Sequence, residues 1–259
     1  MKLSFIGIEA MPLINPGDDL TSLIGEAVAG MGESLKSGDV LVIAQKVVSK
    51  AEDRYLDLRH VTPSAEAYAL ALEVDKDPRK VQAILDESTE VVRKRQGVLI
   101  VEHRLGFVQA NAGIDQSNIA HVDDPDDSLC LLLPLDPDAS ARQIRDAISE
   151  RHGVEVGVII NDSLGRAWRN GSLGLAIGVA GFTALEDYVG QTDLYGRELK
   201  VTLVAAADEM AAGASLVMGQ TREKTPVVLV RGYTPQEPTN PALRGVGPLI
   251  RAKAMDLFR

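Results

Sequence analysis

Cysteine and histidine are scarce in this sequence. The single cysteine, Cys130, cannot form an intramolecular disulfide, and the 4 histidines show neither a Cys/His cluster nor the His-Glu-x-x-His pattern of a zinc-binding helix. We therefore do not expect structural zinc. Cys130 lies in an apolar stretch, which predicts a buried core residue rather than a nucleophile. No histidine lies in a local pattern typical of Ser-His-Asp or Cys-His catalysis.

Long apolar runs and an excess of basic residues are also missing. The apolar stretch after Lys2 is too short for the core of a signal peptide, and no run reaches membrane-spanning length. With 27 Lys and Arg against 37 Asp and Glu, the net charge is −10, which argues against general affinity for nucleic acid or anionic lipid. We expect a cytoplasmic protein without nucleic-acid or membrane partners, in which a few residues bind any phosphate locally.

Glycine-rich nucleotide fingerprints are absent too. The sequence holds no Gly-x-Gly-x-x-Gly motif, and Met218–Thr225 is not a P-loop, because Glu223 replaces the second glycine and because a helix precedes the segment and a strand follows it. The segment remains a candidate nucleotide-contacting loop, with Gln220 as an oxygen donor. The glycines at 171, 174, 178 and 181 indicate close strand packing and turns rather than phosphate binding.

The chain has 259 residues, 45% of them hydrophobic, which is enough for a large core. Short apolar runs between turn signals predict strands: Leu3–Ile8, Val40–Val48, Val98–Val101, Leu129–Leu133, Val156–Ile160, Leu175–Val179, Val201–Ala205 and Val227–Val230. Helical patterns run from Asp18 or Asp19 to Gly30, from Pro78 through Val92, over Ala139–His152 with Asp138 or Ser140 as cap, and over Ala206–Met218. Because strands and helices do not alternate regularly, we predict an α+β fold.

Domain boundaries are weakly marked. No linker interrupts residues 1–231, which we interpret as one catalytic region of interleaved lobes. The stretch Gly232–Pro248 is rich in proline and predicts an extended connector before a short terminal helix, Leu249–Phe258. Residues 232–259 thus continue the same unit.

Two segments carry acidic groups suited to a divalent cation. The segment Asn111–Asn118 displays the Asp115 carboxylate and the Asn118 carboxamide after a glycine turn. At the end of a predicted strand, Asp162 and Ser163 precede Arg166 and Arg169, a pattern that fits Mg²⁺ or Mn²⁺ with phosphate oxygens and arginines that grip a phosphate or carboxylate. The alternative interpretation of both segments is structural: the acids cap turns or helices, and the arginines form surface ion pairs. Trp168 fits a packing anchor better than a stacking platform.

Two lysines follow a predicted buried strand. Lys46 and Lys50 come at the end of Val40–Val48, where each ammonium fits a nucleotide phosphate. A solvated sheet edge is the alternative interpretation of the same residues.

Several segments together resemble the coenzyme F420-0:L-glutamate ligase family over nearly the whole chain. The segments that carry the resemblance are Met11–Ile14 with Pro16–Leu20, Gly38–Leu41, Lys46–Glu52, Asn111–Asp115 with Ser117 and Asn118, Leu133–Pro134 with Asp136–Arg142, Asp162–Arg169, Ala176–Gly181, Gly196–Leu199, Val217–Gly219 and Asp256–Arg259.

The resemblance implies a ligase that forms an amide bond between coenzyme F420-0 and L-glutamate, with γ-glutamyl extension as a further step. It also implies GTP as co-substrate, two Mg²⁺ or Mn²⁺ ions, K⁺ as an optional further ion, two intertwined lobes with mixed and antiparallel sheets, and a homodimer. The matching positions make Asp115, Asp162, Arg166 and Arg169 the candidate catalytic residues and Asp115, Asp162, Ser163 and Gln220 the candidate metal ligands. The candidate GTP contacts are Met11, Pro12, Leu13, Ile14, Gln45, Lys46, Lys50, Asn118, Met218, Gly219, Gln220, Thr221, Arg222, Glu223, Lys224 and Thr225.

The chain departs from the family pattern at four places. Ser163 stands for a usual threonine and keeps the hydroxyl, while Gln45 stands for a serine before Lys46 and Ala167 for a proline. The pair Leu173-Gly174 replaces a usual Thr-Asp, which removes an acid and bears on the acceptor.

The mechanism that these residues predict begins with phosphorylation of the acceptor carboxylate by GTP. The α-amino group of L-glutamate then attacks the acyl phosphate, while Lys46 and Lys50 complete the phosphate clamp beside the metals. Three alternatives stay open: the same chemistry on a different carboxylate acceptor, a GTP-binding module without catalysis, and a metallophosphatase, which would normally need more His and Asp ligands.

Overall fold

The structure is a computed structural model that describes residues 2–119, 128–234 and 244–257. Its helices are α1 (Leu20–Gly30), α2 (Gln45–Ala51), α3 (Ala65–Val74), α4 (Pro78–Asp86), α5 (Pro137–His152) and α6 (Ala206–Met218), with the 3₁₀ turns η1 (Leu58–His60), η2 (Asn111–Gly113), η4 (Gly247–Leu249) and η5 (Lys253–Met255). Its strands are β1 (Ser4–Gly7), β2 (Val40–Ala44), β3 (Tyr55–Asp57), β4 (Ser88–Arg95), β5 (Val98–His103), β6 (Val108–Ala110), β7 (Leu129–Leu131), β8 (Gly157–Gly165), β9 (Ser172–Ala180), β10 (Glu186–Asp187), β11 (Leu203–Val204) and β12 (Val227–Arg231). The predicted α+β class is confirmed.

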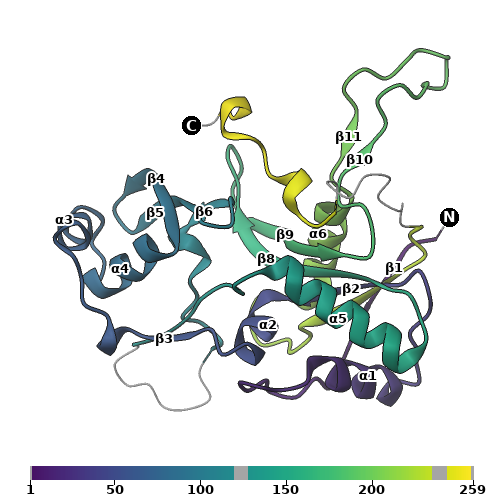
Figure 1. The fold of residues 1–259 in the computed structure, drawn as a ribbon, viewed down its shortest axis with the longest axis horizontal. Coiled ribbons are helices and arrows are strands. Elements are labelled where there is room, and N and C mark those ends of the chain that lie inside the picture. Colours follow the sequence, from purple (N-terminus) through teal and green to yellow (C-terminus); the bar gives the residue numbers. More distant parts are fainter. Residues whose placement is uncertain (1, 120–127, 235–243, 258–259) are drawn as a thin grey trace.

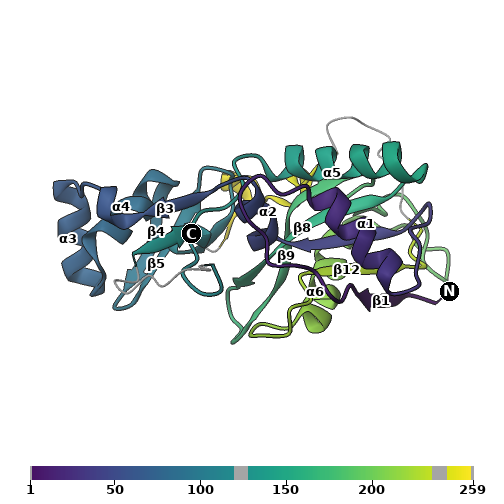
Figure 2. The ribbon, with the colours of Figure 1, turned by 90° about the horizontal axis from the view of Figure 1, so that it is seen from below.

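A mixed five-stranded sheet of order β1-β12-β2-β8-β9 forms the larger part of the molecule, here called the sheet lobe. The pair β2 and β8 is parallel, and the other neighbours are antiparallel. Helices cover both faces: Leu41 and Ile43 of β2 pack in the cluster that includes α1 and α5, whereas Val40 and Val42 pack in the cluster that includes α6 (Figures 1 and 2). Burial on both faces explains why β2 is a continuous apolar run.

A second, smaller part, here called the small lobe, comes from the chain between α2 and α5. It contains α3, α4, η2 and the antiparallel sheet β4-β5-β6, and it has its own apolar cluster (Figure 1). Cys130 is fully buried in this cluster, as predicted for a core residue. The ribbon formed by β3 and β7 lies between the small lobe and α2.

Helices α1 and α6 agree with the predicted ranges, and the ends of α5 have clear physical causes. Asp136, rather than Asp138 or Ser140, caps α5 by accepting a hydrogen bond from the amide of Ala139 at 2.9 Å. Gly153 ends the helix in the left-handed region, where a glycine has no Cβ to clash. Asp138 instead accepts the amide of Val179 on the edge strand β9 at 2.8 Å.

Two predicted boundaries are wrong. The strand predicted over Val40–Val48 ends at Ala44, and the chain then turns into α2, whose side chains Val47 and Val48 are buried as helix residues. The helix predicted from Pro78 through Val92 ends at Asp86, because the following residues pair with β5 as strand β4. Apolar character alone did not separate strand from helix at these places.

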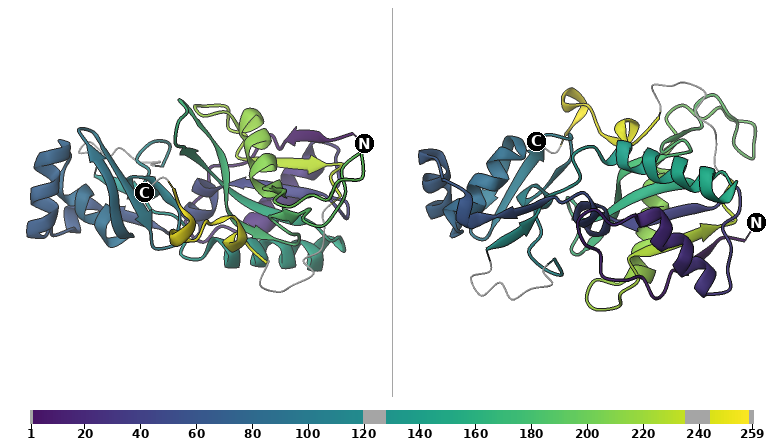
Figure 3. Two further views of the ribbon diagram at one scale, coloured as in Figure 1. Left: turned by 90° about the horizontal axis from the view of Figure 1, so that it is seen from above. Right: turned by 60° about the horizontal axis from the view of Figure 1, so that its bottom comes forward.

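The last segments also differ from expectation. Within the described residues, 247–255 contain the short turns η4 and η5 instead of the predicted helix over 249–258, and Lys253 pairs with Glu90 and Glu102 of the small lobe. This segment lies between the two lobes (Figure 3). Pro235, Pro238 and Pro241 of the predicted connector lie outside the described residues.

The predicted strand Val201–Ala205 shortens to β11, which pairs with β10 at the base of a projecting hairpin, here called the arm, residues 186–204 (Figure 1). Among the residues that the structure describes, no helix is both long enough and apolar enough to cross a membrane.

Candidate functional site

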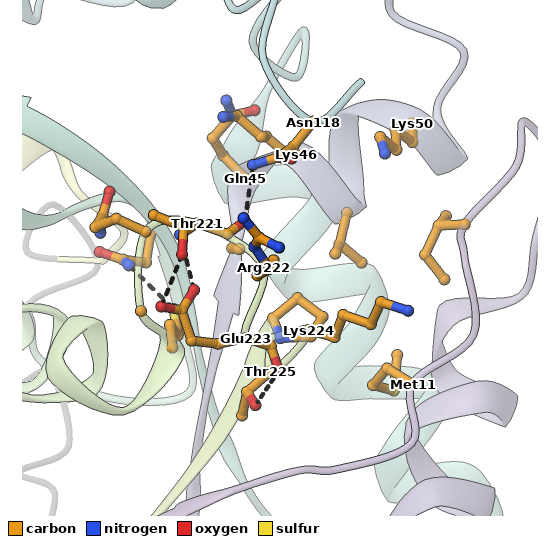
Figure 4. Close-up of a pocket in the computed structure, with 18 of the residues that line it drawn as sticks. Met11, Gln45, Lys46, Lys50, Asn118, Thr221, Arg222, Glu223, Lys224 and Thr225 are labelled. Carbon is orange, nitrogen blue, oxygen red and sulfur yellow. Dashed lines mark hydrogen bonds between the residues drawn. The ribbon is translucent and has the colours of Figure 1, made fainter. Parts of the chain in front are cut away.

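A cavity of about 560 Å³ opens at the end of β2, beside Asp162 and Ser163, which lie within β8 and not at its end as predicted. The strands β2 and β8 are parallel neighbours, with Ala44 opposite Asn161, so the residues after Ala44 and after Asn161 meet at one edge of the sheet. Ligands of α/β sheets bind at such carboxyl ends. The cavity is lined by Met11, Pro12, Leu13, Ile14, Ala44, Gln45, Lys46, Val47, Lys50, Asn118, Asn161, Asp162, Ser163 and the residues 218–226 (Figure 4).

All sixteen candidate GTP contacts line this cavity, although they come from segments far apart in the sequence. Met11 and Ile14 are buried and anchor the first segment, while Leu13 is 63% exposed. Lys46 and Lys50 project from α2 on one side, and Lys224 projects from the opposite loop (Figure 4). Burial lowers the pKa of Lys50, and the charge of Lys46 lowers it further. With Lys46, Lys50 and Lys224 in its lining, the cavity has cationic side chains on several sides, which suits a polyanion.

Helix α2 fixes the position of Asp115, which follows η2. Gln45 is 2% exposed and donates a 2.6 Å hydrogen bond from Nε2 to Oδ2 of Asp115. Ser49, one turn along the helix, donates to Oε1 of Gln45 at 2.8 Å and so fixes the orientation of that amide. Lys46 completes the arrangement, with Nζ 3.3 Å from Oδ1 of Asp115.

Asp162 brings a second carboxylate to the same place. Burial raises the pKa of Asp162 to about 7, and the neighbouring negative charge of Asp115 adds to the rise. Burial also raises the pKa of Asp115, against the opposing effect of Lys46. The two acids, from different lobes, are thus close enough to repel each other.

A hard divalent cation fits this donor set. Two carboxylates with raised pKa values, one of them raised in part by the charge of the other, are stabilised by a cation between them, and oxygen ligands are what Mg²⁺ and Mn²⁺ take. Asn161, beside Asp162, has a buried Oδ1 with no hydrogen-bond partner within the described residues, which adds an oxygen at the cavity wall. In the described part of the chain no group of three or more His, Cys, Asp or Glu side chains gathers, so Asp115 and Asp162 are a pair without a third such ligand. Ser163 and Gln220, the other candidate ligands, line the cavity as well.

The loop after α6 closes one side of the cavity. Glu223 bends back and accepts hydrogen bonds from the amide of Thr221 at 2.7 Å and from its hydroxyl at 3.0 Å (Figure 4). Asn118 donates to the carbonyl oxygen of Thr221 at 3.1 Å and links this loop to the segment that carries Asp115. Gly219 has φ +69°, and a Cβ there would lie 2.3 Å from Cδ of Glu223, so a glycine is required.

The structure does not place Arg166 and Arg169 in the cavity. Arg166 donates to the carbonyl oxygen of Gly171 at 2.8 Å and fixes the turn between β8 and β9, while Arg169 is exposed. Trp168 was predicted as a packing anchor, and this is wrong: it is 85% exposed in that turn, with a φ of +64°.

The glycines of β9 pack closely, as predicted. A Cβ at Gly174 would lie 2.1 Å from Oγ of Ser215 and 2.4 Å from the carbonyl oxygen of Ala211, both on α6. A Cβ at Gly178 would lie 2.4 Å from the carbonyl oxygen of Pro137. A side chain at position 174, the usual acid included, would therefore clash with α6 in this structure.

Sequence reasoning missed three residues of the site. Ser49 supports Gln45, but the spacing of four between them was hidden because the segment was assigned to a strand. Ser117 accepts a hydrogen bond from Nζ of Lys46 at 3.4 Å. Asn161 directly precedes Asp162 within β8, and its position just after the predicted strand Val156–Ile160 was the available signal.

Comparisons with known proteins agree on one family. A family model described as F420-0:Gamma-glutamyl ligase matches residues 7–232. The chain is 47% identical over 259 residues to a coenzyme F420:L-glutamate ligase of Methanothermobacter thermautotrophicus, with 100% of both chains covered. It is 45% identical to the protein of the same name from Methanopyrus kandleri, with 99% of each covered, and 44% identical to that from Archaeoglobus fulgidus, with 90% of this chain and 88% of the relative covered.

Proposed function

Because the chain belongs to the F420-0:gamma-glutamyl ligase family and is a ligase that forms carbon–nitrogen bonds, we propose that it joins a carboxylate of coenzyme F420-0 to the amino group of L-glutamate, with GTP as energy source. The relatives named above carry this acceptor and this amino acid in their names. The observation that supports the proposal most is the convergence of Asp115 and Asp162 beside a cavity with cationic walls.

Amide formation needs activation, because the oxygen of a carboxylate is a poor leaving group. In the proposed reaction a carboxylate oxygen of the acceptor attacks the γ-phosphorus of GTP, the bond from that phosphorus to the bridging oxygen breaks, and GDP leaves. The amine of L-glutamate then attacks the acyl carbon, the carbon–oxygen bond to phosphate breaks, and the amine loses a proton. The products are the amide, GDP and phosphate.

The chain's own residues provide binding and orientation in this scheme. Lys46 and Lys50 neutralise the phosphates from α2, and Lys224 does so from the opposite loop. Gln45 and Lys46 hold the Asp115 carboxylate in place. Asp115 and Asp162, with Ser163 and Gln220, would hold the Mg²⁺ or Mn²⁺ ions, which when bound neutralise phosphate charge.

Packing bears on the question of a different acceptor. The notable departure from the family pattern, Gly174, is required by the contact of β9 with α6. It therefore has a structural cause, and F420-0 remains the acceptor that the relatives' names support.

We also propose a homodimer. The arm exposes apolar side chains to an unusual degree, with Leu194 98%, Tyr195 90% and Val201 86% exposed. Such clusters mark interaction surfaces. Sedimentation of the wild type and of Tyr195→Asp tests this: the proposal expects a dimer that the substitution weakens, and a monomeric wild type contradicts it.

The function is tested with purified protein, GTP, L-glutamate and F420-0, with each metal and without. We expect metal-dependent GDP formation together with a product heavier by one glutamyl residue, and loss of both in Asp162→Ala. GDP formation that ignores glutamate would favour a GTP hydrolase, and tight GTP binding without turnover would favour a binding module.

A further inference from the structure

Two lysines near the start of α4 are half-buried without an anionic partner. Among the residues that the structure describes, neither Lys76 nor Lys80 forms an ion pair with a carboxylate. Nearby cations of the small lobe do so: Arg79 pairs with Asp77 and Lys94 with Glu73. Half-buried ammonium groups usually have a counter-charge, because burial without one costs free energy.

The side chain of Lys80 reaches the segment that carries Asp115. Its ammonium donates a hydrogen bond to Oε1 of Gln116, the residue after Asp115. Its charge opposes the rise that burial causes in the pKa of Asp115, and no ion pair joins Lys80 to Asp115 within the described residues. Lys46 contacts Asp115 from the sheet lobe, and Asp115 thus lies between lysines from both lobes.

Lys76 extends the same positive group. Burial lowers the pKa of Lys76, and the charge of Lys80 lowers it further, which places the two ammonium groups near each other. Neither lysine lines the nucleotide cavity, whose cationic wall contains Lys46, Lys50 and Lys224. Lys76 and Lys80 are therefore a separate positive site on the small-lobe side of Asp115.

We propose that Lys80, assisted by Lys76, binds a carboxylate of the incoming L-glutamate and so determines the choice of an acidic amino acid. The inference rests on the proposed function. The amine must approach the activated acceptor beside Asp115 and Asp162, and these acids repel an anionic amino acid. A cationic pair on that side offsets the repulsion, and charge-assisted hydrogen bonds to a carboxylate supply orientation.

A carboxylate can also come from the acceptor, and steady-state kinetics separates the two sources. The variants are Lys80→Gln and Lys76→Gln, with Lys80→Arg as the charge-preserving variant and Lys200→Gln, on the exposed arm, as control. For Lys80→Gln we expect the KM for L-glutamate to rise roughly tenfold or more, with unchanged KM values for GTP and F420-0 and a small change in kcat. Lys76→Gln should act in the same direction but less, and Lys80→Arg should retain most of the affinity for glutamate.

Each other outcome overturns the inference. An unchanged KM for L-glutamate in Lys80→Gln rules out the contact, and a rise in the KM for F420-0 alone assigns the carboxylate to the acceptor. Circular dichroism and thermal unfolding check that the variants fold. If the wild type does not ligate, the proposed function fails by itself. Saturation-transfer NMR with L-glutamate and the unreacted protein then decides the inference, which expects binding by wild type and by Lys80→Arg but not by Lys80→Gln.

Discussion

The carboxamide of Gln45 donates a 2.6 Å hydrogen bond to the Asp115 carboxylate, 70 residues away in sequence. The bond joins the first residue of α2 to the segment after η2 of the small lobe, so it fixes one lobe to the other at the candidate metal centre. Ser49 holds the other end of the Gln45 amide.

Loss of this amide should loosen the metal centre. In Gln45→Ala, Asp115 loses the donor that orients it, and groups that orient metal ligands typically change metal affinity or activity by about 10- to 100-fold. Titration of Mn²⁺ in the presence of GTP measures the affinity. Ser49→Ala should show a smaller loss in the same direction. Wild-type affinity in Gln45→Ala would show that the bond does not matter for the cation.

The raised pKa of Asp162 predicts a pH-dependent stability of the metal-free protein. A carboxyl whose pKa is 3.8 in the unfolded chain and about 7 in the folded chain binds its proton more tightly when folded. Stability is therefore highest below about pH 4 as far as this group is concerned, and it falls as the pH rises towards 7. At about 1.36 kcal/mol per pKa unit, the loss is at most about 4 kcal/mol.

Asp162→Asn removes this titration and should be more stable than the metal-free wild type at pH 8, with a flatter profile between pH 5 and 8. Denaturant unfolding at several pH values provides the measurement, and Glu150→Gln, exposed on α5, is the control. Added Mg²⁺ should recover stability at pH 8 in the wild type but not in Asp162→Asn. Parallel profiles of stability against pH for the wild type and Asp162→Asn would show that folding does not raise the pKa of Asp162.

Packing at Gly174 predicts that the chain cannot accept the usual acid at that position. In Gly174→Asp, and in Gly174→Ala, the new Cβ would lie 2.4 Å from a backbone oxygen of α6 that cannot move aside. We expect a loss of about 1–3 kcal/mol or more for Gly174→Ala in thermal or denaturant unfolding. Gly165→Ala is the matched control, because that glycine of β8 has open space around its Cβ position. Equal stability of the two alanine variants would mean that α6 does not press on β9.

The loop after α6 should control nucleotide affinity. Asn118→Ala removes the 3.1 Å hydrogen bond to the carbonyl oxygen of Thr221, and the loop loses its link to the Asp115 segment. We expect GTP to bind about 3- to 10-fold more weakly, the value of an ordinary hydrogen bond, in titration calorimetry. Thr202→Ala, on the arm, is the control. Stronger GTP binding in Asn118→Ala would show that the link restrains the loop in an unsuitable position.

Local patterns in the sequence predicted some parts of the molecule well. Asp19 before α1 predicted that helix as its cap, and Met210, Ala214 and Met218, spaced four residues apart, predicted one face of α6, because a cap and a helical spacing are local signals. The candidate GTP residues followed from the family resemblance, and the cavity contains all of them. Their functional roles stay predictions.

Other parts depended on contacts that no local pattern carries. The division of Val40–Val48 into β2 and α2 does not follow the apolar pattern, because Val47 and Val48 are buried as residues of α2 after the pairing of β2 with β8 ends at Ala44 and Asn161. Arg166 donates to a backbone carbonyl in the hairpin turn, a contact that its charge did not predict, and its role toward the acceptor stays a prediction. Lys80 lies in an ordinary helix of the small lobe, and only the fold brings it to Asp115.

The central claim is that the acceptor carboxylate is activated as an acyl phosphate beside Asp115 and Asp162. Ligation with F420-0 labelled with ¹⁸O in the reacting carboxylate tests it most directly, with mass analysis of the released phosphate. The account predicts one labelled oxygen in each phosphate released by the wild type and no labelled phosphate from Asp162→Asn. Amide product accompanied by unlabelled phosphate would contradict it.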